Sequence, residues 1–278
     1  MPAKRDPALP VKSALPPILL VGCGRMGGAM LAAWLEHGLA PSVVVDPVPR
    51  LPPGAEAAVT LAAAAAIPVA FAPAAVVLAV KPQQAEGVLP AFARFAGSSV
   101  FLSIMAGRTL GGMQAALGPN AAIVRAMPNT PAAIRAGMSV ACAGPGVDEA
   151  GRRLSETLLA AVGRVAWVED EALLDPVTAV SGSGPAYVFL LGELLERAGI
   201  EQGLPADLAR LLARRTIAGA GALLEAGEED AAALRAAVTS PGGTTERALS
   251  VLMDERAWPS AISRAVAAAT ERSRELSG

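Results

Sequence analysis

A glycine-rich turn near the start of the chain restricts its fold more than any other feature. Residues 16–22, PPILLVG, form a short apolar run typical of a buried strand, and GCGRMGGAM overlaps its end. Gly22, Gly24 and Gly27 therefore have the spacing G-x-G-x-x-G between a predicted strand and a helix that reaches about His37. Gly22 allows a tight turn, Gly24 lets the backbone approach a pyrophosphate, and Gly27 lets the helix pack on the sheet. With the helix N-terminus facing the phosphates, the sequence predicts a dinucleotide-binding unit.

The rest of the first half alternates between strands and helices. Residues 57–80 carry no charge, but Pro68, Pro73 and the lack of basic or aromatic flanks favour a short helix and two buried strands over a membrane span. The alternation predicts a mostly parallel sheet covered on both faces. The strands are expected at 16–22, 42–46, 74–80, 98–104, 121–127, 138–144 and 163–168, with further helices at 82–95, 109–117 and 148–162.

The strand pattern stops near residue 169, which we take as a domain boundary. We expect a flexible tail at 1–15, a Rossmann-type dinucleotide-binding domain at 16–168 and an all-α domain at 169–278. The tail has three prolines and no apolar block, so it does not read as a signal peptide. The predicted C-terminal helices lie within 172–180, 186–199, 205–227, 230–238 and 260–276. Because these helices are apolar around much of their circumference, a dimer is favoured over a compact monomeric bundle.

Charge and cysteine usage exclude several classes of function. The net charge of −2 offers no basic surplus for a phosphate backbone, so nucleic acid is not an expected partner. Cys23 and Cys142 are far apart and provide neither a disulfide framework nor metal-ligand spacing, so no metal site is expected. Two reduced, buried thiols indicate a cytoplasmic protein.

Three polar residues are expected where the cofactor lies. Asp46 ends the second predicted strand, where a carboxylate can accept hydrogen bonds from the adenosine ribose and favour NAD. Arg50 follows four residues later and can pair with a 2′-phosphate, so the DPVPR segment leaves NAD and NADP open. Lys81 and Pro82 follow the strand at 74–80 at the carboxyl edge of the sheet, although a solvated lysine would look the same.

The acid–base residues that are missing narrow the chemistry. Reduction of a carbonyl creates an alkoxide and needs a positioned acid, usually histidine or lysine. His37 is the only histidine and ends the first helix, and the chain has no lysine beyond Lys81. Hydroxyacid dehydrogenases of a similar two-domain layout use a lysine on the first long C-terminal helix, where this chain reads SGSGPAYVFLL. Reduction of an imine is favoured, because an imine nitrogen can be protonated before hydride arrives.

The segment VTSPGGTTERAL interrupts the helical half with turn residues and hydroxyls. Gly242 and Gly243 are expected to expose backbone N–H groups at a helix N-terminus, which can bind a carboxylate. Ser240, Thr244 and Thr245 supply hydroxyls beside it. Ordinary helix capping by serine or threonine is the alternative.

The sequence resembles the pyrroline-5-carboxylate reductase family over about residues 16–275. The resemblance rests on VGCGRMGGAM, AVKPQ, RAMPNTPAAIRAG, SGSGPAY and VTSPGGTTERAL, of which the last two are the most specific. It implies NAD(P)H-dependent reduction of 1-pyrroline-5-carboxylate to L-proline, with NADPH favoured over NADH. It also implies a Rossmann-type domain and a helical domain that intertwines with its partner in a homodimer, which can assemble further into an oligomer such as a decamer.

The resemblance also implies roles for individual residues. Thr245 corresponds to the threonine that hydrogen-bonds the imine nitrogen. Glu228 matches an acidic position near the substrate, and the expected substrate-binding set is Glu228, Ser240, Gly242, Gly243, Thr244 and Thr245. The expected cofactor-binding set is Val21, Gly22, Cys23, Gly24, Arg25, Met26, Gly27, Asp46, Ala79, Val80, Lys81, Pro82, Ala106, Gly107 and Asn129. The DPVPR loop departs from the shorter polar loops of the family.

Two other functions fit parts of the pattern. An imine reductase with a different substrate would share the architecture, and a substrate profile would separate it. A non-catalytic NAD(P)H-binding regulator would bind nucleotide without needing the whole SPGGTT segment.

Overall fold

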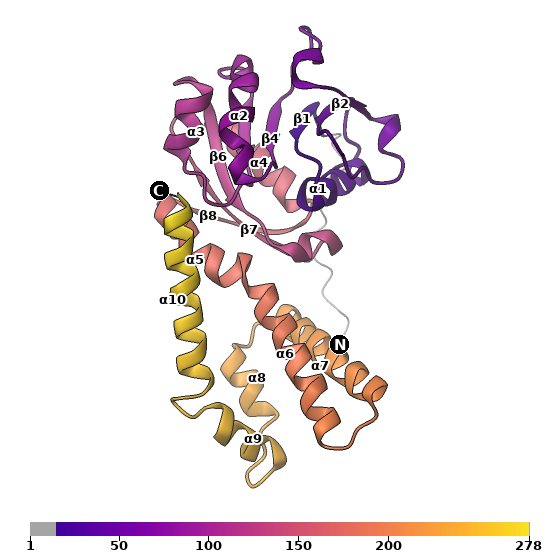
Figure 1. Cartoon of the computed structure of the whole chain (residues 1–278), viewed down its shortest axis with the longest axis vertical. Helices are drawn as coiled ribbons and strands as arrows, with labels where there is room; N and C mark the ends of the chain where they lie inside the picture. Colours follow the sequence, from indigo (N-terminus) through magenta and orange to yellow (C-terminus); the bar gives the residue numbers. More distant parts are fainter. Residues whose placement is uncertain (1–14, 278) are drawn as a thin grey trace. The chain divides into compact units, whose positions relative to one another are not determined.

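The computed structural model describes residues 15–277, and the predicted tail lies almost entirely outside this range. An eight-stranded sheet has the order β3-β2-β1-β4-β5-β6-β7-β8, and all neighbouring pairs are parallel except β6 and β7 (Figure 1). The predicted α/β class, with a mostly parallel sheet followed by helices, is confirmed. The strands are β1 Ile18–Val21, β2 Ser42–Val45, β3 Val59–Leu61, β4 Ala75–Leu78, β5 Val100–Ser103, β6 Ala122–Met127, β7 Gly137–Ala143 and β8 Gly163–Val168.

Helices cover both faces of this sheet. On one face α1 (Arg25–Glu36) and α4 (Glu149–Ala160) pack together, and the Trp34 indole Nε1–H donates to the Leu158 carbonyl at 2.9 Å. On the other face α3 (Leu110–Leu117) and the η4 turn (Leu89–Phe95) bury large side chains such as Phe92. The central strands β1, β4 and β5 are buried along their whole length, which explains their continuous apolar sequence.

Two predictions in this half were wrong in detail. The single helix expected at 82–95 is instead the 3₁₀ turn η3 (Pro82–Gln84), a short α2 (Ala85–Val88) and the 3₁₀ segment η4. Pro90 near the start of η4 lacks the N–H that an α-helix would need there. Of the two buried strands expected within 57–80, β4 is buried but β3 is not, because β3 lies at the edge of the sheet.

The smaller elements complete this half of the chain. They are the 3₁₀ turns η1 Ala55–Ala57, η2 Ala64–Ala66, η5 Thr130–Ile134 and η6 Glu171–Leu173, followed by α5 Leu174–Val177 and the π-helical turn η7 Thr178–Gly182. The helical second half contains α6 Gly184–Glu201, α7 Ala206–Ala226, α8 Ala231–Ala237, α9 Thr244–Leu252 and α10 Trp258–Ser277. No helix within residues 15–277 is long and apolar enough to cross a membrane.

The chain divides into two compact units. We call the first the sheet unit, which contains the described residues up to Gly182 and those from Thr270 on, and the second, Ser183–Ala269, the helical unit. The division falls later than the boundary expected at 168/169, because Leu174 packs against Val140 and Cys142 of β7. The end of α10 also belongs to the sheet unit, where the Ser273 hydroxyl donates to Asp175 at 2.7 Å.

Candidate functional site

The glycine turn after β1 has the geometry of a phosphate cradle. Gly22 has φ +93°, and a Cβ there would lie 2.6 Å from the Ala79 carbonyl oxygen. A Cβ on Gly27 would collide with the Gly22 carbonyl oxygen, whereas one on Gly24 would meet open space. Gly24 caps α1 without a side chain, so the backbone N–H groups of the first turn stay available to an anion. The residues present therefore fit a dinucleotide pyrophosphate.

The cradle lies at the position that open α/β sheets use for ligands. The chain connects from β1 to β2 on one side, and the later strand β4 pairs with β1 on the other, so the strand order reverses at β1. Ligands bind at the carboxyl ends of strands next to such a reversal. Val21 and Cys23 are buried beside the turn, Arg25 is exposed at the first position of α1, and Met26 packs partly against the core.

The carboxylate expected to bind ribose is already engaged by backbone groups. The Cys23 N–H donates to Asp46 Oδ2 at 2.6 Å, and the Val48 N–H donates to Oδ1 at 2.7 Å. The Arg50 N–H donates to the Cys23 carbonyl at 2.7 Å, so the segment after β2 is hydrogen-bonded to the glycine turn. The Arg50 side chain is exposed and forms no ion pair within the described residues.

The loops after β4 and β5 carry the next group of expected cofactor contacts. Ala79 and Val80 follow the end of β4 and are half-buried, while Lys81 is exposed and Pro82 is the first residue of η3. Ala106 is half-buried and Gly107 is buried at φ +67°, where a Cβ would lie 3.0 Å from the Leu276 carbonyl oxygen of α10. This close approach restricts the position to glycine.

Arg108 connects these two loops through its side chain, a role that was not predicted from the sequence. Its Nε–H donates to the Pro82 carbonyl at 2.9 Å, and its Nη1 pairs with Glu86 at 3.2 Å. An arginine directly after the Ala-Gly pair is the only sequence signal for this contact. Its guanidinium fixes the spacing of the loops that carry Lys81 and Ala106.

Asn129 links three segments at the end of β6. Its Oδ1 accepts from the Met138 N–H at 2.9 Å, and its Nδ2 donates to the Ser181 hydroxyl at 3.2 Å. Ser181 lies in the π-helical turn η7, and such turns are frequent at functional sites. The Asn129 side chain therefore fixes the backbone at the end of β6, where the sequence predicts a cofactor contact.

The two cysteines are both buried and free. Burial raises the pKa of the Cys23 thiol, and the neighbouring Asp46 charge raises it further. Burial likewise raises the pKa of Cys142. Both thiols are therefore protonated near neutral pH, and Cys23 Sγ lies 3.5 Å from the Arg50 carbonyl oxygen, as a weak donor. The described residues contain no group of three or more metal-binding side chains.

In the turn between α8 and α9, the backbone N–H groups that are free to bind a ligand are not those expected from the sequence. Gly242 and Gly243 were expected to expose their N–H groups. Instead the Gly242 N–H donates to Glu246 Oε2 at 2.8 Å, and the Gly243 N–H donates to the Ser240 carbonyl at 3.0 Å. The turn closes on itself because Gly242 adopts φ +69°, which leaves the first N–H groups of α9 as the available donors.

The N-terminus of α9 has no side-chain cap of its own. Gly243 is its N-cap, whereas α3, α4 and α8 are capped by the side chains of Thr109, Asp148 and Asp230. The backbone N–H groups of Thr244 and Thr245 thus lack a capping acceptor, as do those at the start of α1. The N-cap residues of α1 and α9 are Gly24 and Gly243, and these are the helices to which the sequence assigns an anion.

Residues with hydroxyl side chains are next to this N-terminus in the chain. Thr245 is half-buried at the second position of α9, and the side chains of Ser240 and Thr244 are exposed. Glu228 is exposed in the connection between α7 and α8, a separate segment from the turn. The structure therefore brings together five of the six expected substrate residues through chain proximity.

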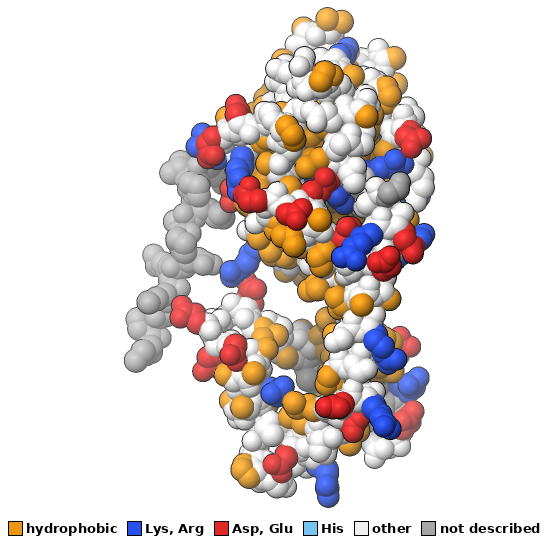
Figure 2. All heavy atoms as spheres, turned by 90° about the vertical axis from the view of Figure 1, so that its left-hand side faces the viewer, with side chains coloured by type: hydrophobic (Ala, Val, Ile, Leu, Met, Phe, Trp, Pro, Cys, Tyr) orange, Lys and Arg blue, Asp and Glu red, His pale blue; other side chains and the backbone are white. Residues whose placement is uncertain are grey.

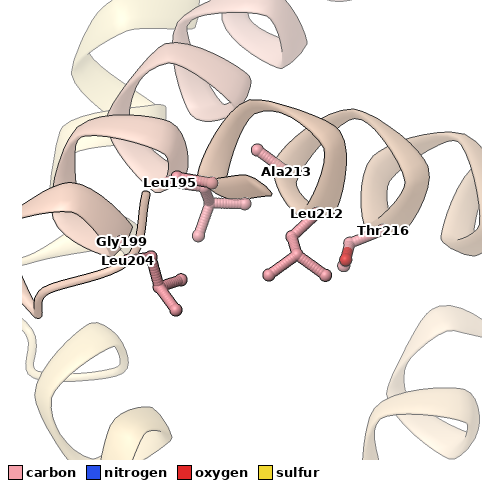
Figure 3. A pocket seen from close by; sticks show the side chains of 7 residues that line it. Leu195, Gly199, Leu204, Leu212, Ala213 and Thr216 are labelled. Carbon is pink, nitrogen blue, oxygen red and sulfur yellow. The ribbon is translucent and has the colours of Figure 1, made fainter. Parts of the chain in front are cut away.

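An apolar hollow marks the surface of the helical unit. It has a volume of about 160 Å³ and lies between α6 and α7, and Figure 3 shows Leu195, Leu204 and Leu212 around it. Further hydrophobic side chains reach the surface of this unit, as the lower part of Figure 2 shows. The hollow is open and has no ionisable lining, so it fits apolar side chains rather than a charged substrate.

Comparison with known proteins matches two separate regions of the chain. Residues 171–276 match the family model described as pyrroline-5-carboxylate reductase dimerisation, and residues 17–107 match the one described as NADP oxidoreductase, coenzyme F420-dependent. The pyrroline-5-carboxylate reductase of Pseudomonas aeruginosa is 37% identical over 94% of this chain and 97% of its own length. The enzyme of the same name from Synechocystis is 44% identical over 72% of this chain and 73% of its own.

Solved structures show the same fold. The pyrroline-5-carboxylate reductase from Coxiella burnetii is 32% identical and superposes with a TM-score of 0.82, covering 95% of this chain and 99% of that one. The Plasmodium falciparum pyrroline carboxylate reductase with NADP bound has the same TM-score and coverage at 26% identity. The chain carries the family's dimerisation domain, is an oxidoreductase, and belongs to the pyrroline-5-carboxylate reductase family.

Proposed function

We propose that this chain reduces 1-pyrroline-5-carboxylate to L-proline by anchoring the substrate carboxylate at the N-terminus of α9, beside the Thr245 hydroxyl. The observation that carries this proposal is the uncapped start of α9, where the Thr244 and Thr245 N–H groups have no side-chain acceptor. A helix N-terminus favours an anion through its free N–H groups and its dipole. Family membership supports the identity of the substrate.

Thr245 is the residue we assign to the ring nitrogen. It lies in the first turn of α9, so a substrate held through its carboxylate there places its ring close to the half-buried hydroxyl. A bound nicotinamide would supply the hydride to the imine carbon. The nitrogen is protonated before transfer, and the hydroxyl orients the nitrogen, so no strong acid is needed.

We infer that the cofactor is NADPH in preference to NADH. Each Asp46 oxygen already accepts one backbone N–H, which leaves each oxygen a further lone pair for a ribose hydroxyl, so Asp46 does not separate the two cofactors. Arg25 and Arg50 flank the glycine turn, are exposed, and form no ion pair within the described part of the chain. Unpaired guanidinium groups favour the additional phosphate of NADPH. The NADP-bound relative supports the same choice.

We further propose a cytoplasmic homodimer, with a decamer as a larger assembly, and no nucleic-acid partner. The dimerisation model over 171–276 and the exposed apolar side chains of the helical unit support self-association. The net charge of −2 supports the absence of a nucleic-acid partner.

The test is the oxidation of NADPH and of NADH, followed by near-ultraviolet absorbance, with and without 1-pyrroline-5-carboxylate. Substrate-dependent oxidation that is faster with NADPH is expected. Cofactor binding without oxidation by this substrate would contradict the proposal. A panel of other cyclic imines would then separate an enzyme of different specificity from a non-catalytic nucleotide-binding regulator.

A further inference from the structure

Glu246 is a carboxylate in the first turn of α9, the helix whose N-terminus is proposed to bind the substrate carboxylate. It is the third residue of α9, and its Oε2 accepts the Gly242 N–H at 2.8 Å. Gly242 has φ +69°, a conformation that side-chain-bearing residues rarely adopt. The hydrogen bond from Gly242 to Glu246 therefore fixes Gly242, and the direction of the turn depends on the backbone angles of Gly242.

The N-cap position itself cannot carry a capping side chain. A Cβ on the N-cap residue Gly243 would lie 2.9 Å from the Ser240 carbonyl oxygen, so the close turn excludes serine or aspartate there. Glu246 reaches back from inside the helix instead, and it bonds the N–H before the N-cap rather than those after it. This choice leaves the N–H groups of Thr244 and Thr245 for a ligand.

The charge of Glu246 acts on the same helix end as the substrate. A carboxylate in the first turn interacts favourably with the helix dipole, but it repels a second anion bound there. Arg235 lines the same open hollow as Glu246, yet the two form no ion pair within 4.0 Å in the described structure. The Glu246 charge is therefore not neutralised by a close partner.

We propose that Glu246 is a positioning residue with two opposing effects on the substrate site. As an acceptor it fixes the turn and directs the substrate carboxylate to the Thr244 and Thr245 N–H groups. As a charge it limits how tightly that carboxylate binds. This proposal rests on the proposed function, because it takes the anion at α9 to be the imine acid or its product.

Two substitutions in the full-length protein distinguish the role of Glu246 as an acceptor from the effect of its charge. Glu246→Gln keeps an oxygen acceptor and removes the charge, so KM for 1-pyrroline-5-carboxylate should fall about threefold. Glu246→Ala removes the acceptor as well and loosens the turn, so KM should rise about fivefold. KM is measured at saturating NADPH, and L-proline binding to the NADP⁺-loaded protein is measured by calorimetry. The proline dissociation constant should move in the same two directions.

Asp148→Ala is the matched control. It removes a side-chain cap from α4 of the sheet unit, where the Asp148 Oδ1 accepts the Gly151 N–H at 2.8 Å. It should lower Tm without changing KM or proline binding. KM changes of the same sign in both Glu246 variants, or none in either, would reduce Glu246 to a helix cap and overturn the proposal. If the natural protein oxidises no NADPH with this substrate, the proposed function fails instead, and proline binding still tests Glu246.

Discussion

The two units of this chain bury their apolar side chains to very different extents. In the sheet unit, β1, β4 and β5 are buried along their whole length beneath helices on both faces. In the helical unit, only Ala209 and Ala213 among the described hydrophobic residues are buried. Phe189 is 70% exposed and Leu223 is 64% exposed, although both lie on long helices.

The proposed cofactor-binding turn and the proposed substrate-binding turn belong to different units, so this difference applies to them as well. The phosphate cradle belongs to a unit that completes its own core. The proposed substrate turn belongs to a unit whose helices expose many large hydrophobic side chains, which indicates that another protein surface covers them. We therefore expect cofactor binding to be independent of assembly and substrate turnover to depend on it.

Thr245→Ala should have the largest effect of these substitutions. The effect should be on turnover and not on cofactor binding. Loss of the hydroxyl leaves the imine nitrogen without its partner, so kcat/KM should fall at least about 100-fold, while NADPH affinity stays unchanged. Steady-state kinetics and calorimetric titration measure the two quantities. Thr157→Ala, at an exposed threonine of α4, serves as the control. Unchanged turnover in Thr245→Ala would remove this hydroxyl from the mechanism.

Gly27→Ala should weaken cofactor binding at the glycine turn of the sheet unit. The new Cβ would collide with the Gly22 carbonyl oxygen, a backbone atom that cannot move without distorting the cradle. NADPH binding should weaken about 30-fold, as expected for about 2 kcal/mol of overpacking. Gly111→Ala on α3 is the control, because its Cβ would meet nothing within 4 Å. Equal affinity in the two variants would contradict the cradle.

Phe189→Asp tests whether the helical unit depends on a second copy. A charge at this exposed position of α6 should reduce self-association, and specific activity at micromolar protein should fall about tenfold with NADPH affinity unchanged. Light scattering and activity assays over a range of protein concentrations measure both. Val69→Asp is the control, because Val69 is 95% exposed on the sheet unit. If Phe189→Asp retained the natural mass and activity, the contrast between the units would lose its functional meaning.

Arg50→Gln should have the smallest effect, limited to the choice of cofactor. Removal of an exposed guanidinium should lower kcat/KM for NADPH about fivefold and leave NADH unaffected. The binding of 2′,5′-ADP compared with 5′-AMP reports the same preference without turnover. Equal losses for both cofactors would show that Arg50 does not recognise the 2′-phosphate.

Local sequence patterns were sufficient to predict most of the secondary structure and the places where the site residues occur. The apolar runs before Gly22 and Asp46 predicted β1 and β2, because strands buried on both faces need continuous apolar sequence. The glycine spacing predicted the cradle, since only glycine tolerates the φ of Gly22 and the close approach at Gly27. The helix expected at 82–95 was wrong because one proline outweighed an otherwise helical composition.

The tertiary structure alone decided which polar groups remain available. Asp46 stays a predicted ribose ligand, and only the structure shows that its oxygens also accept the Cys23 and Val48 N–H groups. Gly242 and Gly243 were predicted as open donors, but Glu246 and the Ser240 carbonyl take their N–H groups. Spacing along a sequence shows which residue types occur together. It does not show how a turn directs each N–H, because that direction depends on backbone angles and on side chains that reach back from neighbouring elements.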